Sequence, residues 1–213
     1  MQDTLHFLME SHKLKDVKRQ GILLYGVKKS DSALEHSFRM ALMAAIFGKE
    51  KKINIAKAIK IALVHDLCKV YAGDITPYEG LLPKSKKQKA ELASRWRRVS
   101  LAEKGKMQAL KMKKEKEALE KITKLLPPGL RAEIMNLWFD YNQGKSKEAK
   151  FIQQIDVIEN LLEAFEWRLK NKEFPTLPWW EHVNETVDDP VLIQFIKEIA
   201  KAELQKFCKD GKK

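Results

Sequence analysis

Cysteine is scarce in this chain of 213 residues, which contains only Cys68 and Cys208. The two thiols do not have the Cys-x-x-Cys spacing of a zinc knuckle, and they imply no disulfide framework. Cys68 follows His65 by three residues and could act as a soft metal ligand. A free cysteine more often packs as a small buried residue. The sequence is therefore not organised around sulfur.

Long apolar runs are also missing, and no stretch reaches the roughly eighteen apolar residues that a membrane span needs. The N-terminus has no basic start followed by an apolar run, so we expect no secretory signal. A hydrophobic content of 44% beside a charged content of 33% is typical of soluble, helix-rich proteins. We expect one domain over residues 1–213, a cytoplasmic location and no membrane partner.

Acidic residues are outnumbered, and the formal charge of +12 is concentrated in one segment. Between Lys84 and Lys116, thirteen lysines and arginines stand against three glutamates, which gives +10 of the total. A basic helix around residues 95–98 could follow a nucleic-acid backbone, but lysine-rich helices are more often only solvated. The sequence therefore leaves a nucleic-acid partner open but does not favour it.

Helical periodicity dominates the chain and predicts an all-α protein. The first helix should bury Leu5, Leu8 and Met9. Residues 172–213 are expected to form a C-terminal loop, rich in proline and tryptophan, and one helix. The predicted helices cover residues 3–13, 32–47, 54–67, 85–126 and 130–142, a segment that begins after Ser146, and residues 190–207.

The adjacent pair His65 and Asp66 interrupts an apolar helix that contains Ile55, Ile59 and Ala62 at helical spacing. A purely structural helix would continue there with leucine or alanine. An imidazole nitrogen and a carboxylate oxygen form a mixed donor set that suits first-row divalent metals. Two ligands do not make a site, so other histidines or acids must lie on apolar helix faces.

Two further residues meet that requirement. Ser32 and Glu35 form a capping box that places His36 in the first turn of a helix. Asp156 lies one turn after Ile152, at the border of an apolar stripe, and a buried carboxylate needs a metal or a cation beside it. Taken singly, such residues are more often a hydrogen-bonded core histidine or a solvated aspartate, so the prediction depends on the set.

The order of these residues resembles that of the HD-domain metal-dependent phosphohydrolases. The chain has a histidine, then a His-Asp pair, then an aspartate on a late helix. The neighbouring residues are similar to those of the 5′-deoxynucleotidase branch of that superfamily, and the resemblance spans roughly residues 15–170. It implies an HD-domain helical bundle, in which residues 84–108 are longer than expected and are predicted to be a basic, helical insertion. The similar stretches are Glu35-His36-Ser37, Ala62-Leu63-Val64-His65-Asp66, Gly73-Asp74-Ile75-Thr76-Pro77 and Gln154-Ile155-Asp156.

The resemblance also implies a cofactor and an activity. The cofactor is one divalent transition metal ion (Mn, Co, Fe, Ni or Zn). The substrate is a nucleoside 5′-monophosphate, with 2′-deoxyribonucleotides favoured, which is hydrolysed to nucleoside and phosphate. Arg19 fits the position of the family's phosphate-binding arginine, because a guanidinium offers a planar fork of donors to phosphate oxygens. Without the resemblance, Arg19 would be read as a surface cation. The implied metal ligands are His36, His65, Asp66 and Asp156.

One residue departs from the family pattern. The branch places a glutamate three residues after the aspartate of its His-Asp pair, and this chain has Lys69, which cannot accept a proton while it is charged. Another acid (Glu35, Asp74 or Glu115) could do that work, Lys69 could neutralise phosphate charge, or the site could bind nucleotide and turn over slowly.

The candidate catalytic residues are accordingly Asp74, Lys69 and Glu35, and the candidate substrate-binding residues are Arg19 and Asp74. Asp74 could equally be an ordinary residue of a Gly-Asp turn. The alternative function is a catalytically weak HD scaffold that binds nucleotide or nucleic acid through its basic segment. The sequence leaves a homodimer open.

Overall fold

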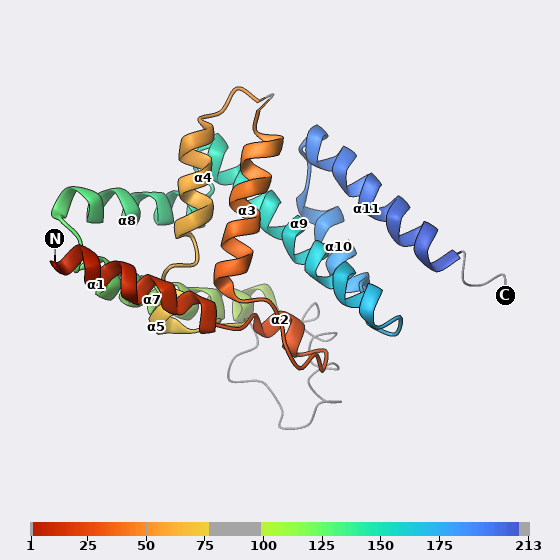
Figure 1. Ribbon diagram of the computed structural model, residues 1–213, viewed down its shortest axis with the longest axis horizontal. Coiled ribbons are helices and arrows are strands. Elements are labelled where there is room, and N and C mark those ends of the chain that lie inside the picture. The colour runs from red at the N-terminus through yellow and green to blue at the C-terminus, as the bar shows by residue number, and fades with distance from the viewer. Residues whose placement is uncertain (1, 50, 77–98, 209–213) are drawn as a thin grey trace. The chain divides into compact units, whose positions relative to one another are not determined.

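The structure, a computed structural model, describes residues 2–49, 51–76 and 99–208. Within these ranges the regular secondary structure is helical, apart from an isolated bridge between Lys18 and Ser32 (Figure 1). The prediction of an all-α protein is therefore confirmed. No helix in the described ranges has the length and hydropathy of a membrane span. Most of the predicted basic insertion, residues 84–98, lies outside the described residues, and its last part begins helix α7.

The described residues divide into two compact units, residues 1–37 with 64–139 and residues 38–63 with 140–213. A single domain over residues 1–213 stays a prediction. The helices are α1 (Gln2–Ser11), η1 (His12–Asp16), α2 (Gln20–Leu23), α3 (Ala33–Phe47), α4 (Ile55–Val64), α5 (Lys69–Ala72), α7 (Leu101–Thr123), α8 (Pro128–Gln143), α9 (Lys147–Lys170), α10 (Leu177–Thr186) and α11 (Pro190–Cys208).

Both predicted helix starts are confirmed. Glu35 N–H donates to Ser32 Oγ at 3.2 Å, and Ser32 N–H donates to Glu35 Oε2 at 2.7 Å, which together form a capping box at the start of α3. Ser146 Oγ accepts from Ala149 N–H at 3.1 Å and caps α9. The first cap places His36 in the first turn of α3, where its N–H bonds to Ser32 C=O.

In the first unit, α1 and α5 pack along α7 (Figure 1). Trp138 of α8 is fully buried among apolar residues of these helices. The prediction that Leu5, Leu8 and Met9 face inward was wrong, because all three are exposed. Phe7 packs against the core instead. The helical period therefore turns the face with Phe7 inward and the leucines outward. The core comprises Leu14, Ala33, Leu67, Cys68, Ala118, Leu119, Ile122, Leu126, Ile134 and Trp138.

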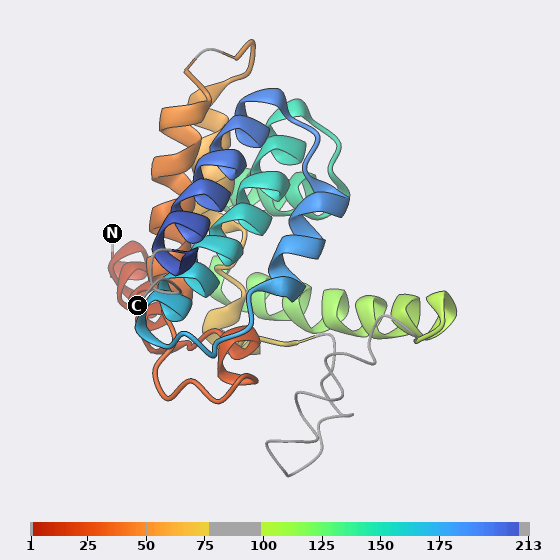
Figure 2. The ribbon, with the colours of Figure 1, turned by 90° about the vertical axis from the view of Figure 1, so that its right-hand side faces the viewer.

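In the second unit, α10 and α11 pack against the long helix α9 (Figure 2). The apolar residues Ile152, Ile155 and Ile158 of α9 are fully buried. Helix α10 was not predicted, since its proline and tryptophans indicated a loop. Pro178 lies in the first turn, where a helix has no intrahelical use for the missing N–H. The predicted C-terminal loop and helix is thus a loop followed by two helices.

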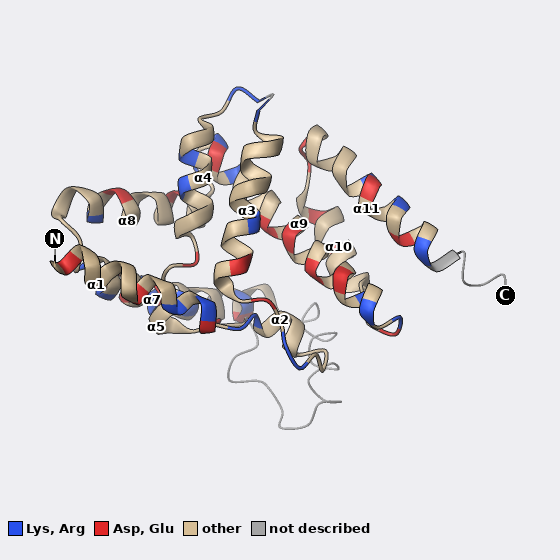
Figure 3. Ribbon diagram, in the orientation of Figure 1, with Lys and Arg blue, Asp and Glu red and all other residues tan. Residues whose placement is uncertain are grey.

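Arg39 of α3 forms ion pairs with two glutamates of α9, a helix along which acidic residues recur (Figure 3). Its Nε donates to Glu159 Oε1 at 2.8 Å, and its Nη1 donates to Glu166 Oε1 at 2.8 Å. The Glu159 side chain is completely buried. A buried carboxylate is tolerated only beside a cation or hydrogen-bond donors, so Arg39 stabilises the buried Glu159 carboxylate.

We expect Arg39→Met to lower the free energy of unfolding by about 3 kcal/mol, because it leaves the buried carboxylate of Glu159 without its cation. Urea denaturation followed by circular dichroism measures this change. The control is Lys201→Met, which removes an exposed ion pair with Glu198 and should cost less than about 0.5 kcal/mol. Equal losses in the two variants would contradict the role assigned to Arg39.

Candidate metal-binding site

His36 and His65 are buried side by side in the first unit. They are 1% and 4% exposed, and their ring centroids lie 5.3 Å apart in an edge-to-face arrangement. The helix predicted over residues 54–67 ends at Val64. After it, Leu67 N–H bonds to Val64 C=O and Lys69 N–H bonds to Asp66 C=O, so three-residue turns replace the α-helical pattern. His65 and Asp66 therefore lie in a tight turn between α4 and α5.

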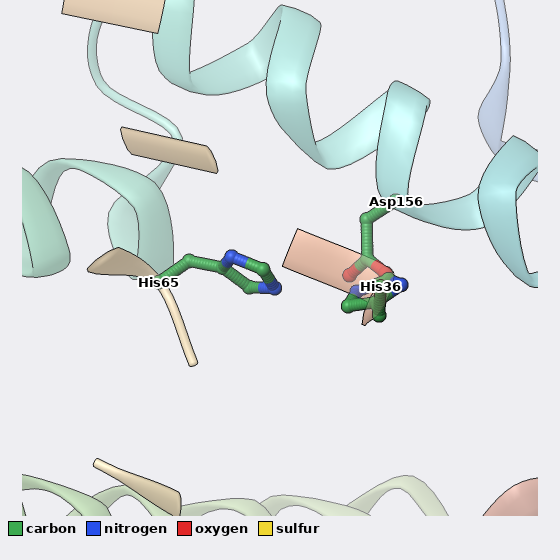
Figure 4. Close-up of side chains that lie close together, drawn as sticks. All are labelled: His36, His65 and Asp156. Carbon is green, nitrogen blue, oxygen red and sulfur yellow. The ribbon is translucent and has the colours of Figure 1, made fainter. Parts of the chain in front are cut away.

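Three of the predicted ligands form a group of possible metal donors. One ligand atom from each of His36, His65 and Asp156 lies within 4.8 Å of the other two (Figure 4). Two imidazoles and a carboxylate are a donor set that suits a first-row divalent metal ion. The residues present thus fit the cofactor that the sequence predicted, although they do not identify the metal.

Two neighbours orient the Asp156 carboxylate. Tyr141 O–H donates to Asp156 Oδ2 at 2.6 Å, and Asn160 Nδ2 donates to Asp156 Oδ1 at 2.9 Å. Such partners hold a ligating carboxylate in place. Neither contact was predicted from the sequence. Helical spacing could have revealed Asn160, one turn after Asp156, but no local pattern marks Tyr141 on the preceding helix.

Asp66, the fourth predicted ligand, adjoins His65 and Lys69. Its Oδ2 lies 3.4 Å from His65 Nε2 and 2.8 Å from Lys69 Nζ. Burial alone would raise the pKa of the Asp66 carboxyl, but the neighbouring His65 and Lys69 outweigh burial and hold this pKa well below its usual range. Asp66 is therefore an ionised carboxylate beside one of the grouped histidines.

Lys69 lies buried between two carboxylates rather than at the surface. Its Nζ is 2.8 Å from Asp66 Oδ2 and 2.6 Å from Asp74 Oδ1. Asp74 Oδ2 in turn accepts from Gln20 N–H at 2.7 Å. Burial would lower the pKa of Lys69, but the two aspartates raise it above its usual value. Lys69 is therefore a permanent cation.

Arg19 precedes α2 and is also buried. Its N–H donates to Asp31 C=O at 3.2 Å. The pKa of Asp74 is raised by burial and lowered more strongly by Lys69, and the charge of Arg19 lowers it further. Because Arg19 is buried, the interpretation of Arg19 as a plain surface cation does not describe this structure.

The other candidate acids have different surroundings. The Glu35 carboxylate accepts from both Ser32 N–H and Ser32 O–H at 2.7 Å, and these bonds lower its pKa. Its oxygen is engaged in the helix cap. Glu115 of α7 is buried, 3.7 Å from Lys111 Nζ, and burial raises its pKa. The charges of Asp66 and Asp74 add to that effect, and those of Lys111 and Lys69 oppose it.

The sequence matches one family model and several known proteins. The family model described as HD domain matches residues 11–111 and 99–185. The mouse 5′-deoxynucleotidase HDDC2 is 32% identical over 92% of this chain and 85% of its own length. The Schizosaccharomyces pombe 5′-deoxynucleotidase hdd1 is 29% identical over 88% of this chain and 83% of its own length.

A solved structure agrees at the level of the fold. A predicted metal-dependent phosphohydrolase from Magnetospirillum magnetotacticum MS-1 superposes with a TM-score of 0.63 at 20% identity, over 96% of this chain and 95% of that one. The family match extends over most of the chain, and both of these relatives are described as 5′-deoxynucleotidases. The chain therefore belongs to the HD-domain family, in the branch of the 5′-deoxynucleotidases.

Proposed function

We propose that this protein is a metal-dependent phosphohydrolase that converts 2′-deoxyribonucleoside 5′-monophosphates to nucleoside and phosphate. The observation that carries the proposal is the gathering of His36, His65 and Asp156 donor atoms within 4.8 Å, in a chain similar to 5′-deoxynucleotidases. Asp66 completes the proposed ligand set, because its carboxylate adjoins His65. A divalent ion held there polarises a phosphoryl oxygen and favours ionisation of a water molecule.

The remaining roles fall to side chains of the first unit. Arg19 binds the phosphate oxygens through its planar fork of N–H donors. Asp74 accepts the proton of the attacking water, since it is ionised and is held in place by Lys69 and Gln20 N–H. Lys69 is excluded as that base because it stays an ammonium. Glu35 is left out because its carboxylate serves the cap of α3.

A binding protein with little turnover is the second candidate, and Lys69 is the observation that favours it. The metal-loaded protein would then bind deoxynucleoside monophosphates without releasing phosphate. Phosphate release measured beside equilibrium binding of the same nucleotides separates the two functions. A cytoplasmic location, a homodimer and a nucleic-acid partner stay predictions from the sequence.

We expect the isolated protein to hold one divalent transition metal ion per chain and His65→Ala to lose it. Removing a partner that only orients a ligand weakens metal affinity by about 10–100-fold, so removing a direct ligand should cost at least as much. Elemental analysis and calorimetric titration measure the effect. The control is His182→Ala, at an exposed histidine of α10. Full metal content in His65→Ala would rule out the proposed ligand set.

We expect Arg19→Lys to reduce kcat/KM for deoxynucleoside monophosphates by about tenfold or more. Lysine keeps the charge but loses the bidentate fork, which amounts to about one charge-assisted hydrogen bond. Phosphate release at saturating metal measures the change. The matched control is Arg131→Lys on α8, for which we expect no change. An unaltered kcat/KM in Arg19→Lys would remove Arg19 from the phosphate site.

A further inference from the structure

A lysine is rarely buried unless it is paired, and Lys69 is paired twice. Its side chain is 10% exposed, and its Nζ lies 2.8 Å from Asp66 Oδ2 and 2.6 Å from Asp74 Oδ1. These distances are those of strong, charge-assisted contacts. Two of the three ammonium N–H groups are thus committed to carboxylates before any ligand arrives. This commitment argues against Lys69 as a free phosphate-binding cation.

The contacts form a continuous chain across three segments. Asp66 lies in the turn that carries His65, Lys69 opens α5, and Asp74 follows that helix and accepts from Gln20 N–H at 2.7 Å. Gln20 is the neighbour of Arg19. One ammonium therefore connects the turn with two proposed metal ligands to the segment with the proposed phosphate-binding arginine.

Acids outnumber the other cations around Lys69. Asp66, Asp74 and Glu115 are acids whose charges act on this cluster, Arg19 acts on it as a second cation, and Lys111 Nζ lies 3.7 Å from Glu115. The imidazole of His65 lies on the Asp66 side, with Nε2 3.4 Å from Asp66 Oδ2. Without Lys69, these three carboxyl groups would be balanced by two cations, Arg19 and Lys111.

We propose that Lys69 is a positioning residue that acts as an internal counter-cation: it fixes the Asp66 and Asp74 carboxylates and weakens their attraction for a divalent metal ion. The inference rests on the proposed function, because it concerns the same metal site. A neutral hydrogen-bond donor beside Asp66 would only orient the carboxylate. An ammonium also repels a cation that shares this carboxylate, and such repulsion is strong where little water screens it.

The test is Mn²⁺ binding by the metal-stripped, full-length protein, followed through the electron paramagnetic resonance signal of free Mn²⁺. We expect Lys69→Met and Lys69→Gln to bind Mn²⁺ at least about tenfold more tightly than the wild type, because one unit of opposing charge is removed. Lys69→Arg keeps the charge and should stay within about threefold of the wild type. Unchanged or weaker Mn²⁺ binding in both neutral variants would overturn the proposal.

Lys57 supplies a matched control. Its Nζ lies between Asp140 Oδ2 at 2.7 Å and Glu148 Oε2 at 3.6 Å, but its side chain is 34% exposed and neither acid is a proposed ligand. Lys57→Met removes the same charge from a similar pair and should leave Mn²⁺ affinity within about threefold of the wild type. A tenfold gain in this variant as well would mean that net charge alone acts, and would overturn a specific role for Lys69.

Thermal unfolding keeps the test decisive if the neutral variants are unstable. Mn²⁺ should raise the Tm of Lys69→Met and Lys69→Gln more than that of the wild type, because tighter binding stabilises the folded state more. Variants that stay unfolded with and without Mn²⁺ would contradict the proposal and leave Lys69 a purely structural residue. The Mn²⁺ binding assay contains no nucleotide, so tighter Mn²⁺ binding supports the role of Lys69 even if no phosphate is released. Absence of Mn²⁺ binding in the wild type and in every variant would contradict both the metal site and this proposal.

Discussion

The buried charges of Lys69 and Glu159 are tolerated because oppositely charged groups lie beside them, and this constraint shapes both compact units. In the first unit, Lys69 is held between Asp66 and Asp74. In the second, Arg39 compensates Glu159, whose side chain is completely buried. An ion taken out of water is tolerated when an opposite charge and hydrogen bonds replace the lost hydration. Each pair therefore fixes the elements that carry it and leaves little freedom for either partner alone.

Local sequence predicted the helices best where the signal lies within one turn. The Ser32 and Glu35 capping box and the Ser146 cap are formed as the sequence indicated, because capping depends on residues three apart. The inward face of α1 could not be read in the same way. Leucine and methionine face out there because the surrounding helices, rather than hydrophobicity alone, decide which stripe is covered. Helix α10 was missed because a proline in a first turn resembles a proline in a loop.

The candidate site shows the same difference between features that the sequence predicts and contacts that it does not. The order of His36, His65 and Asp156 pointed to a common site, and the structure groups their donor atoms. The pairing of Lys69 with Asp74 had no such signal. It depends on Gly73, which ends α5 with φ of 72°, a conformation that other residues rarely adopt, and so turns Asp74 back toward the lysine. The Tyr141 contact to Asp156 likewise joins two helices, and no spacing within one helix predicts it.

A lysine at position 69, where the family resemblance implies a glutamate, has opposite consequences for the two ligands of a phosphohydrolase. With Asp66, Asp74 and Glu115 counted as charged beside Lys69, Arg19 and Lys111, the cluster has a formal charge of three minus against three plus, or 0. A glutamate at position 69 would make that charge −2. A less negative cluster attracts a divalent cation less and repels a phosphate dianion less, and both effects are largest in a buried site with little screening. The cation that weakens the hold on the metal therefore also eases the approach of the substrate phosphate, so the lysine shifts the balance between two ligands of opposite charge instead of simply removing an acid.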